Sequence, residues 1–321
     1  MIFSLGKKTF FAAGALGAGM LLSKRKNAGD VNNLQGDKAI VTGGAMGFGF
    51  CICKRLVREG VEVTIWDLNE EAMAKAKQEL ESMGGKIYTY KCDVSDRKRV
   101  EELCAQAKKD MGRVDILINN AGFFRPGVFH ERPVEEAVRQ MEVNMHAHFY
   151  TTHAVLPDMI ARNHGYVVNV SSSAAFIGGL GWSTYCSSKS AVHGFTDVLR
   201  TEMLCLGKKG VKFISVHPGQ VKTGMFEGVN LGIVGKLAPP MESHDTVAEG
   251  IVEDGLKRDK TIICRPKTMY IMWMIRGWVP NKILDRLVGL PSKDSLTAYR
   301  GRPGMAHTDP EAEKKAKAAT A

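Results

Sequence analysis

Tyr185 and Lys189 form the one pair in the sequence in which a tyrosine is followed by a lysine four residues later. On an α-helix this spacing brings both side chains to one face. A phenol has an ordinary pKa of about 10 and is a poor base at neutral pH, but a nearby ammonium favours the phenolate and brings it toward the working range. The pair therefore predicts a proton-transfer site, although by itself the pattern also suits two residues at a protein surface.

Other polar residues are expected beside this pair. Ser172 stands thirteen residues before Tyr185, in a run of three serines that follows the apolar stretch Tyr166–Val170. If that stretch is a strand of a parallel sheet, the serine hydroxyl lies at its carboxyl end, where such sheets bind ligands, and it can hydrogen-bond a substrate oxygen. Asn120, at the end of the fourth apolar stretch, and Asn144, in the helix expected after it, are further candidates for the same site.

A glycine-rich turn follows the first apolar stretch. Lys38–Thr42 is typical of a strand, and Gly43, Gly47 and Gly49 come between it and an amphipathic stretch. Glycine lets backbone N–H groups and a helix N-terminus approach phosphate closely because it has no Cβ. The turn therefore predicts a pyrophosphate-binding site. A tight strand-to-helix turn without any ligand would use the same residues.

Asp67 ends the second apolar stretch, where a carboxylate accepts both hydroxyls of an adenosine ribose. Its charge would repel a 2′-phosphate, and Leu68 and Asn69 supply no cation, so NAD is predicted in preference to NADP. The alternative role of Asp67 is a helix N-cap, which Asn69 could equally provide. After the sixth stretch, the backbone of Val221 and the hydroxyl of Thr223 are expected to bind the nicotinamide carboxamide.

Alternation of short apolar stretches with amphipathic ones predicts the elements that hold these residues. Seven strands separated by helices favour a doubly wound, seven-stranded parallel sheet of the Rossmann type, in a single α/β domain with both faces covered. The expected strands are Lys38–Thr42, Val61–Trp66, Ile87–Lys91, Val114–Ile118, Tyr166–Val170, Val211–Val216 and Thr261–Cys264. The expected helices span residues 47–59, 69–83, 96–111, 133–162, 183–207 and 244–258.

Five motifs in this order make residues 37–265 similar to the short-chain dehydrogenase/reductase family. They are TGGAMGFG, CDV, NNAG, VNVSSS and YCSSK. The resemblance implies an NAD-dependent oxidoreductase that forms homodimers. It also implies a catalytic tetrad, made of Asn144, Ser172, Tyr185 and Lys189.

The resemblance assigns further roles to single residues. It implies that Lys189 also binds the nicotinamide ribose and that Asn144 holds a water molecule in a proton relay. It places Asp93 near the adenine and Asn120 near the ribose. The sequence departs from the family pattern at Phe48, where a smaller side chain is usual, and this bears on how closely the turn approaches the pyrophosphate.

A narrower resemblance concerns the membrane-bound branch of the family, which contains type-10 retinol dehydrogenase and the 17β-hydroxysteroid dehydrogenases of lipid droplets. It is carried by stretches such as IWDLNEE, NMHAHFYTTHAVLPDMI and ICRPKTMYIM. It implies oxidation of a lipophilic, retinol-like alcohol to the aldehyde or ketone. A 17β-hydroxysteroid dehydrogenase or general carbonyl reductase is the alternative, and a catalytically weak scaffold at a lipid surface is another.

The two ends of the chain favour a membrane or lipid-droplet surface as a partner. Of the formal charge of +10, residues 1–36 carry +4 and residues 261–321 carry +6, so residues 37–260 are neutral. A basic groove within the core would indicate nucleic acid, whereas basic ends suit anionic lipid. The alternative is that both ends only increase solubility. The apolar stretch Thr9–Leu22, flanked by lysines, predicts an uncleaved anchor or monotopic hairpin.

The expected organisation is therefore an anchor at 1–26, a linker at 27–36 and the NAD-binding domain at 37–265. Residues 266–300 would form a lid or membrane-contact helices, and residues 301–321 a polar tail. Seven cysteines without a CxxC pair indicate reduced thiols. Together with the anchor they favour the endoplasmic reticulum membrane or a lipid droplet, with the catalytic domain facing the cytosol. No metal site is expected, because the clustered histidines of the 133–162 helix lack further ligands.

Overall fold

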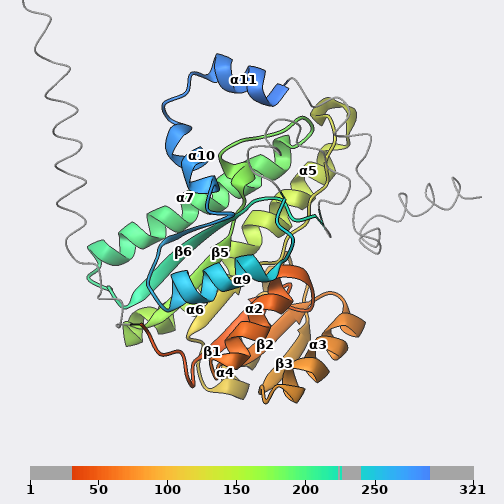
Figure 1. The fold of residues 1–321 in the computed structure, drawn as a ribbon. Helices are drawn as coiled ribbons and strands as arrows, with labels where there is room; N and C mark the ends of the chain where they lie inside the picture. The colour runs from red at the N-terminus through yellow and green to blue at the C-terminus, as the bar shows by residue number, and fades with distance from the viewer. Residues whose placement is uncertain (1–30, 223–224, 226–239, 290–321) are drawn as a thin grey trace, which may run out of the picture. The chain divides into compact units, whose positions relative to one another are not determined.

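The chain divides into two compact units, Met1–Asn33 and Leu34–Ala321. A computed structural model describes residues 31–222, 225 and 240–289, which are coloured in Figure 1. All helices and strands that it describes belong to the second unit.

Four of the expected features fall on residues outside the described ranges. They are the anchor at 1–26, the side chain of Thr223, the end of the C-terminal segment at 290–300 and the tail at 301–321. Among the residues that the structure does describe, none of the helices is long and apolar enough to cross a membrane.

Seven parallel strands form one sheet. They are β1 (Lys38–Thr42), β2 (Glu62–Asp67), β3 (Ile87–Lys91), β4 (Ile116–Asn119), β5 (Gly165–Val170), β6 (Val211–Pro218) and β7 (Ile262–Arg265). Their order across the sheet is β3-β2-β1-β4-β5-β6-β7, and every neighbouring pair is parallel. The predicted seven-stranded α/β sheet is confirmed.

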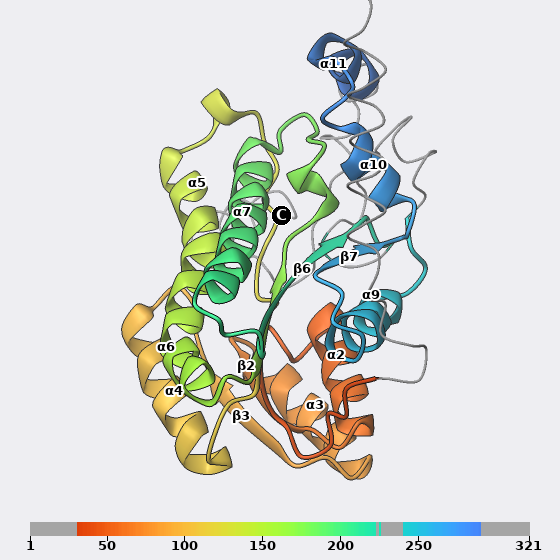
Figure 2. The ribbon, with the colours of Figure 1, turned by 90° about the vertical axis from the view of Figure 1, so that its left-hand side faces the viewer.

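Helices cover both faces of this sheet, as Figures 1 and 2 show. One face carries α2 (Gly47–Arg58), α3 (Glu70–Ser82) and α9 (Asp245–Glu249), and the other carries α4 (Arg97–Met111), α6 (Ala147–Arg162) and α7 (Ser183–Cys205). Successive strand residues point to opposite faces, so Ile65 belongs to one hydrophobic core and its neighbour Trp66 to the other. Burial on both faces explains why the strands are continuous apolar stretches in the sequence.

The long helix expected at 133–162 is interrupted. It consists of α5 (Val134–Met141), a π-helical turn η2 (Glu142–His146) and α6. The helix expected at 244–258 likewise continues from α9 into a π-helical segment, η4 (Gly250–Leu256). A π-turn inserts one residue without breaking the helical path, and such turns occur frequently at functional sites. Asn144 lies within η2.

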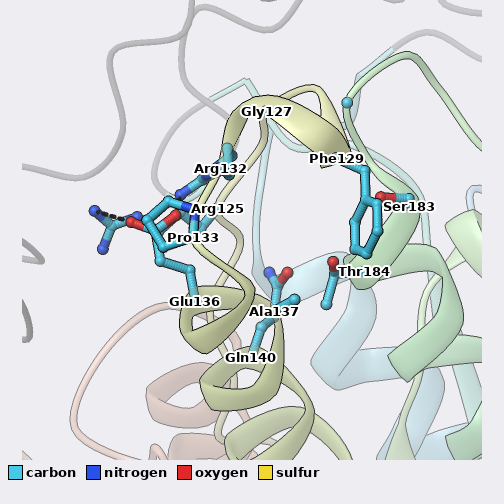
Figure 3. A pocket seen from close by; sticks show the side chains of 11 residues that line it. Arg125, Gly127, Phe129, Arg132, Pro133, Glu136, Ala137, Gln140, Ser183 and Thr184 are labelled. Atoms are coloured by element: carbon cyan, nitrogen blue, oxygen red, sulfur yellow. Dashed lines mark hydrogen bonds and ion pairs between the residues drawn. The ribbon is translucent and has the colours of Figure 1, made fainter.

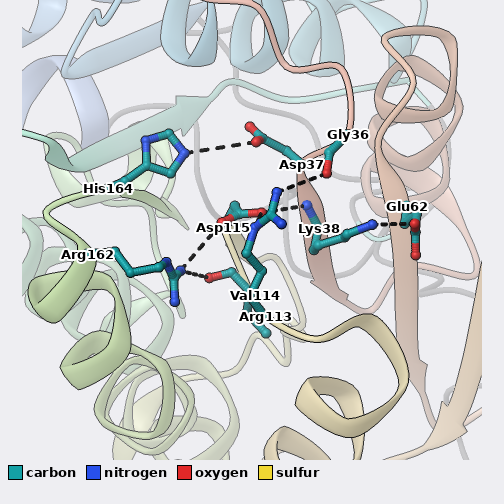
Figure 4. A network of polar contacts seen from close by, with 9 residues as sticks. All are labelled: Gly36, Asp37, Lys38, Glu62, Arg113, Val114, Asp115, Arg162 and His164. Atoms are coloured by element: carbon teal, nitrogen blue, oxygen red, sulfur yellow. Dashed lines mark hydrogen bonds and ion pairs between the residues drawn. The ribbon is translucent and has the colours of Figure 1, made fainter.

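The amino ends of the central strands are joined by the ion-pair network of Figure 4. Asp115, which is only 1% exposed, accepts hydrogen bonds from the backbone N–H of Lys38 at 3.1 Å, from Arg113 Nε at 2.8 Å and from Arg162 Nη2 at 3.4 Å. It thereby ties the start of β1 to β4 and to the end of α6. Asp37 lies in the same network, with His164 Nε2 at 3.9 Å from its carboxylate.

After β7 the described chain forms two further helices, α10 (Met269–Ile275) and α11 (Asn281–Gly289). Both leave large apolar side chains exposed, among them Trp273, Met274 and Ile283, and Trp278 between the helices is 80% exposed.

Candidate active site

Helix α7 carries Tyr185 and Lys189 on one side, at the carboxyl end of the sheet. Each residue is only 4% exposed, and Lys189 Nζ lies 5.9 Å from the centre of the Tyr185 ring. The ammonium is anchored by a 2.8 Å hydrogen bond that it donates to the carbonyl of Val170, the last residue of β5. The structure therefore brings the predicted pair together and fixes the cation from the neighbouring strand.

Ser172 completes this group from the end of β5. Its side chain hydrogen-bonds Tyr185, and its Oγ accepts the backbone N–H of Ala174 at 3.1 Å. Burial raises the pKa of the Tyr185 phenol, while the bond with Ser172 opposes the rise. Burial also lowers the pKa of Lys189 to about 8. Burial therefore opposes the phenolate, which the ammonium and the positive nicotinamide ring of a bound cofactor were expected to favour.

Asn144 is fully buried in the π-turn, and its side chain hydrogen-bonds both the loop after β4 and helix α7. Its Oδ1 accepts the N–H of Phe123 at 2.9 Å, and its Nδ2 donates to the Phe123 carbonyl at 2.9 Å and to Ser188 Oγ at 3.2 Å. Ser188 in turn donates to the Tyr185 carbonyl at 2.7 Å. The side chain of Asn144 therefore connects the loop after β4 to the backbone of the tyrosine.

An apolar wall surrounds the phenol. The rings of Phe124 and Trp182 meet edge to face at 4.9 Å, and Phe124 meets Tyr185 in the same way at 5.0 Å. Ala174 belongs to the same buried cluster, and Met225 packs against it. No local sequence pattern marks these wall residues as part of the site, because loops from three parts of the chain bring them together.

The turn after β1 leaves no room for a side chain at Gly43 or Gly49. Gly43 has φ +61° and Gly47 has φ +57°, which are conformations that favour glycine. A Cβ at Gly49 would overlap the carbonyl oxygen of Gly43 and lie 2.7 Å from Asn120 Nδ2. Asn120 holds this turn by donating from Nδ2 to the carbonyls of Thr42 and Gly43, both at 3.0 Å. These contacts explain why glycine is needed at 43 and 49, and pyrophosphate binding at this turn stays a prediction.

Asp67 lies at the end of β2, beside the glycine turn. Its carboxylate accepts the N–H groups of Ala45 and Asn69, both at 3.1 Å. The N-cap of α3 is Asn69, whose side chain accepts the N–H of Ala72 at 2.9 Å. The alternative role weighed for Asp67, a helix cap, is therefore filled by Asn69, and ribose binding by Asp67 stays a prediction.

The remaining expected residues are placed less directly. Asp93, which follows β3, accepts hydrogen bonds from Arg139 Nη2 and Ser95 Oγ, each at 2.6 Å. Burial raises the pKa of Asp93, but the bonds from Ser95 and Arg139 outweigh it and hold the pKa below its ordinary value. Val221 is buried and forms an isolated parallel bridge with Met241. The position of Thr223 lies outside the described residues.

Figure 3 shows a small hollow beside this site, between the loop after β4, α5 and the start of α7. Thr184 lines it, next in sequence to the tyrosine, but none of the tetrad side chains does. Its polar side is formed by Arg125 and Arg132, which both pair with Glu136. Because none of the four predicted catalytic side chains lines it, we do not assign the chemistry to this hollow.

Comparisons with known proteins agree with this geometry. Residues 37–232 match the family model for short chain dehydrogenases. The sequence is 35% identical over 279 residues to human epidermal retinol dehydrogenase 2, covering 87% of each chain. It is 32% identical over 269 residues to retinol dehydrogenase 10-B of Danio rerio, covering 77% of this chain and 80% of that protein.

The fold is also found in solved structures. A protein of Burkholderia xenovorans described as a short-chain dehydrogenase/reductase superposes with a TM-score of 0.66 at 28% identity, covering 74% of this chain and 98% of that one. The sheet order, the glycine turn and the sequence matches lead to one assignment. The chain belongs to the short-chain dehydrogenase/reductase family, whose members are NAD(P)-dependent oxidoreductases.

Proposed function

We propose that the protein is an NAD-dependent dehydrogenase that oxidises a lipophilic, retinol-like alcohol to the aldehyde or ketone. The observation that carries the proposal is the Tyr185 phenol, which is hydrogen-bonded to Ser172 and enclosed by Phe124 and Trp182. An apolar wall beside the ring of the proposed base suits a substrate that is poorly soluble in water. The names of the relatives supply the retinol-like alcohol as the first substrate class to test.

Each member of the tetrad has a distinct role in this proposal. Ser172 holds the substrate oxygen by a hydrogen bond, and Tyr185 takes the hydroxyl proton as general base. Lys189 stabilises the phenolate by its charge at 5.9 Å from the ring. Asn144 holds the loop after β4 against α7 through its hydrogen bonds to Phe123 and Ser188. Bound NAD supplies the acceptor for the hydride that leaves the alcohol carbon.

The choice of NAD over NADP rests on the charges around Asp67. Its carboxylate disfavours a 2′-phosphate, and the nearest cation in register on β3 is Lys91. Lys91 pairs with Glu70 at 2.6 Å. The charge of Lys91 is therefore offset by that of Glu70.

The proposal includes a location. Residues 1–26 would anchor the protein to the endoplasmic reticulum membrane or a lipid droplet, with residues 37–265 as a cytosol-facing NAD-binding domain and a homodimer as the assembly. The basic ends of the chain support a lipid surface, as do the exposed Trp273 and Trp278 in the segment 266–300. Deleting residues 1–26 and following membrane association by flotation tests the anchor, and a deletion protein that floats with membranes as completely as the full chain contradicts it.

The decisive experiment is an assay of the purified full-length protein with NAD and with NADP. The alcohols are all-trans-retinol, estradiol and a short secondary alcohol. Oxidation of retinol with NAD at the highest kcat/KM supports the proposal. Preference for estradiol or for the short alcohol would favour the steroid dehydrogenase or the general carbonyl reductase instead. If no alcohol is oxidised although NADH binds, a scaffold at a lipid surface becomes the better interpretation.

A further inference from the structure

Behind Ser172, four side chains form a chain of polar contacts that ends at the exposed side of α7. His217 Nδ1 lies 3.2 Å from the Ser172 carbonyl oxygen, and His217 Nε2 lies 2.8 Å from Ser215 Oγ. Ser215 Oγ lies 3.4 Å from His193 Nδ1, and His193 Nε2 lies 3.7 Å from the Asp197 carboxylate. Two of these contacts join different elements, since His217 links β6 to the segment after β5 and His193 links α7 to β6.

The hydrogen bonds of this chain can run in only one direction. A carbonyl oxygen only accepts, so His217 must carry its proton on Nδ1 and donate to Ser172. Burial lowers the pKa of His217 to about 3, so the ring is neutral and its Nε2 must accept the Ser215 hydroxyl. Ser215 Oγ can then accept a hydrogen bond from the Nδ1–H of His193. The tautomer of His217 is therefore set by both of its partners.

The inner part of the chain is removed from water. His217 and Ser215 have no exposed surface, and the ring of Phe176 covers both imidazoles, at 4.4 Å from His217 and 5.6 Å from His193. Trp273 of α10 adds a second ring over Phe176 at 6.4 Å. In such surroundings a hydrogen bond is stronger than in water, and losing one partner leaves the other unsatisfied.

The Ser172 carbonyl is held from two sides. It accepts the backbone N–H of Ala175 at 3.1 Å in addition to His217, so both lone pairs are used. The preceding residue is also fixed, because Ser171 Oγ donates to the Lys189 carbonyl at 2.7 Å. Strand β6 also accepts the backbone N–H of Ser171, at the Val216 carbonyl at 2.8 Å, and the His217 bond adds a contact from β6 at the carbonyl of Ser172 itself.

We propose that His217 is a positioning residue for the reaction, because its Nδ1–H fixes the Ser172 carbonyl and thereby aims the serine hydroxyl at Tyr185. Ser215 and His193 act through His217 by keeping its proton on Nδ1. This inference rests on the proposed function, since it concerns how the same site holds the substrate oxygen.

Three substitutions at position 217 distinguish an effect of this hydrogen bond on kcat from an effect of side-chain packing. His217→Asn places an amide N–H where imidazole Nδ1 stands, so it can still donate to Ser172. His217→Gln places its amide one bond further out, toward Ser215, and His217→Leu has no donor. We expect His217→Asn to keep kcat near the wild-type value, and the other two to lower kcat by about 10- to 100-fold with the KM for NAD unchanged. His153→Leu, at an exposed position of α6, is the control.

Equal kcat values for His217→Asn and His217→Leu, whether both low or both normal, would overturn the inference. A measurement independent of turnover is the tautomer of His217 in ¹⁵N-histidine-labelled protein, assigned by its loss in His217→Asn. We expect the Nδ1–H form throughout the neutral pH range. The Nε2–H form contradicts the inference alone, whereas a wild-type protein that oxidises no alcohol contradicts the proposed function alone.

Discussion

At the scale of single residues, burial has the largest effect on the pKa values of Tyr185 and Lys189. Burial raises the pKa of the phenol and lowers that of the ammonium to about 8. It therefore favours the neutral form of each side chain. The same low dielectric strengthens their mutual attraction when both are charged. A phenolate is therefore favoured here only as part of a pair, together with the hydrogen bond from Ser172.

Tyr185→Phe tests the proposed base. The substitution removes the hydroxyl and leaves the ring contact with Phe124, so the fold should be unaffected. We expect kcat to fall by about 100- to 10,000-fold, as when a general base is lost, while NADH binding measured by fluorescence stays unchanged. Tyr88→Phe, on β3 at a distance from the site, is the matched control. A Tyr185→Phe protein with near-normal turnover would exclude this residue as the base.

Asp67 is the residue to change for cofactor preference. In Asp67→Asn an oxygen remains to accept the N–H of Ala45, but the negative charge is lost. Combined with Leu68→Arg at an exposed position, it should raise kcat/KM for NADP relative to NAD by about 10- to 100-fold. Glu71→Gln, whose exposed carboxylate pairs with Lys75 on the same helix, should leave the ratio unchanged. An unaltered ratio in the double variant would mean that another group selects the cofactor.

At this scale the sequence predicted the residues that have local signals. Tyr185 and Lys189 share a helical spacing, and Ser172 ends a clear strand. Trp182 and His217 have no such signal, because the first joins the site from a loop and the second acts through the backbone of a distant strand. Only the packed fold brings them to the tetrad.

At the scale of elements, apolar periodicity predicted every strand within one to two residues at either end. It did not predict the π-turn η2, because a single inserted residue barely disturbs a helical pattern. The π-turn contains the buried Asn144, whose side chain hydrogen-bonds Phe123 and Ser188.

The turn from β1 to α2 has no space for a methyl group at position 49, and this can be tested by substitution. Gly49→Ala would force its methyl group against the Gly43 carbonyl, so we expect the free energy of unfolding to fall by about 1–3 kcal/mol and NADH binding to weaken. Gly194→Ala in α7 is the matched control, since a Cβ there meets nothing within 4 Å. It should increase stability by about 0.5–1 kcal/mol. Equal stability of the two variants in urea titration would show that the turn has room to open.

At the scale of the molecule, the carboxyl ends of the strands carry the candidate site and the amino ends carry an ion-pair network. The strand order reverses between β1 and β4, and the crevice outside the carboxyl ends at such a point is where doubly wound sheets bind ligands. Gly43 and Asn120 follow these two strands and contact each other there. At the opposite ends of the same strands, Asp115 and its guanidinium partners form the ion-pair network of Figure 4. Chemistry at one end is thus separated from charge compensation at the other.

Asp37 makes the stability of this network dependent on pH. Burial, and then the charge of Asp115, raise the pKa of Asp37 from 3.8 to about 6. The folded protein therefore binds a proton more tightly than the unfolded chain between these values, and its stability declines as pH rises through this interval. A neutral side chain avoids that loss, so we expect Asp37→Asn to be more stable than wild type at neutral pH.

Urea titrations of both proteins at several pH values measure this difference. The gap in the free energy of unfolding should be small near pH 4, increase up to about pH 6 and then stay constant, because the wild-type carboxylate is fully ionised above its folded pKa. Asp158→Asn, which removes an exposed carboxylate of α6, controls for the change in net charge. A gap that is independent of pH, or that has the opposite sign, would mean that His164 and Arg113 compensate Asp37 more strongly than its burial and Asp115 oppose it.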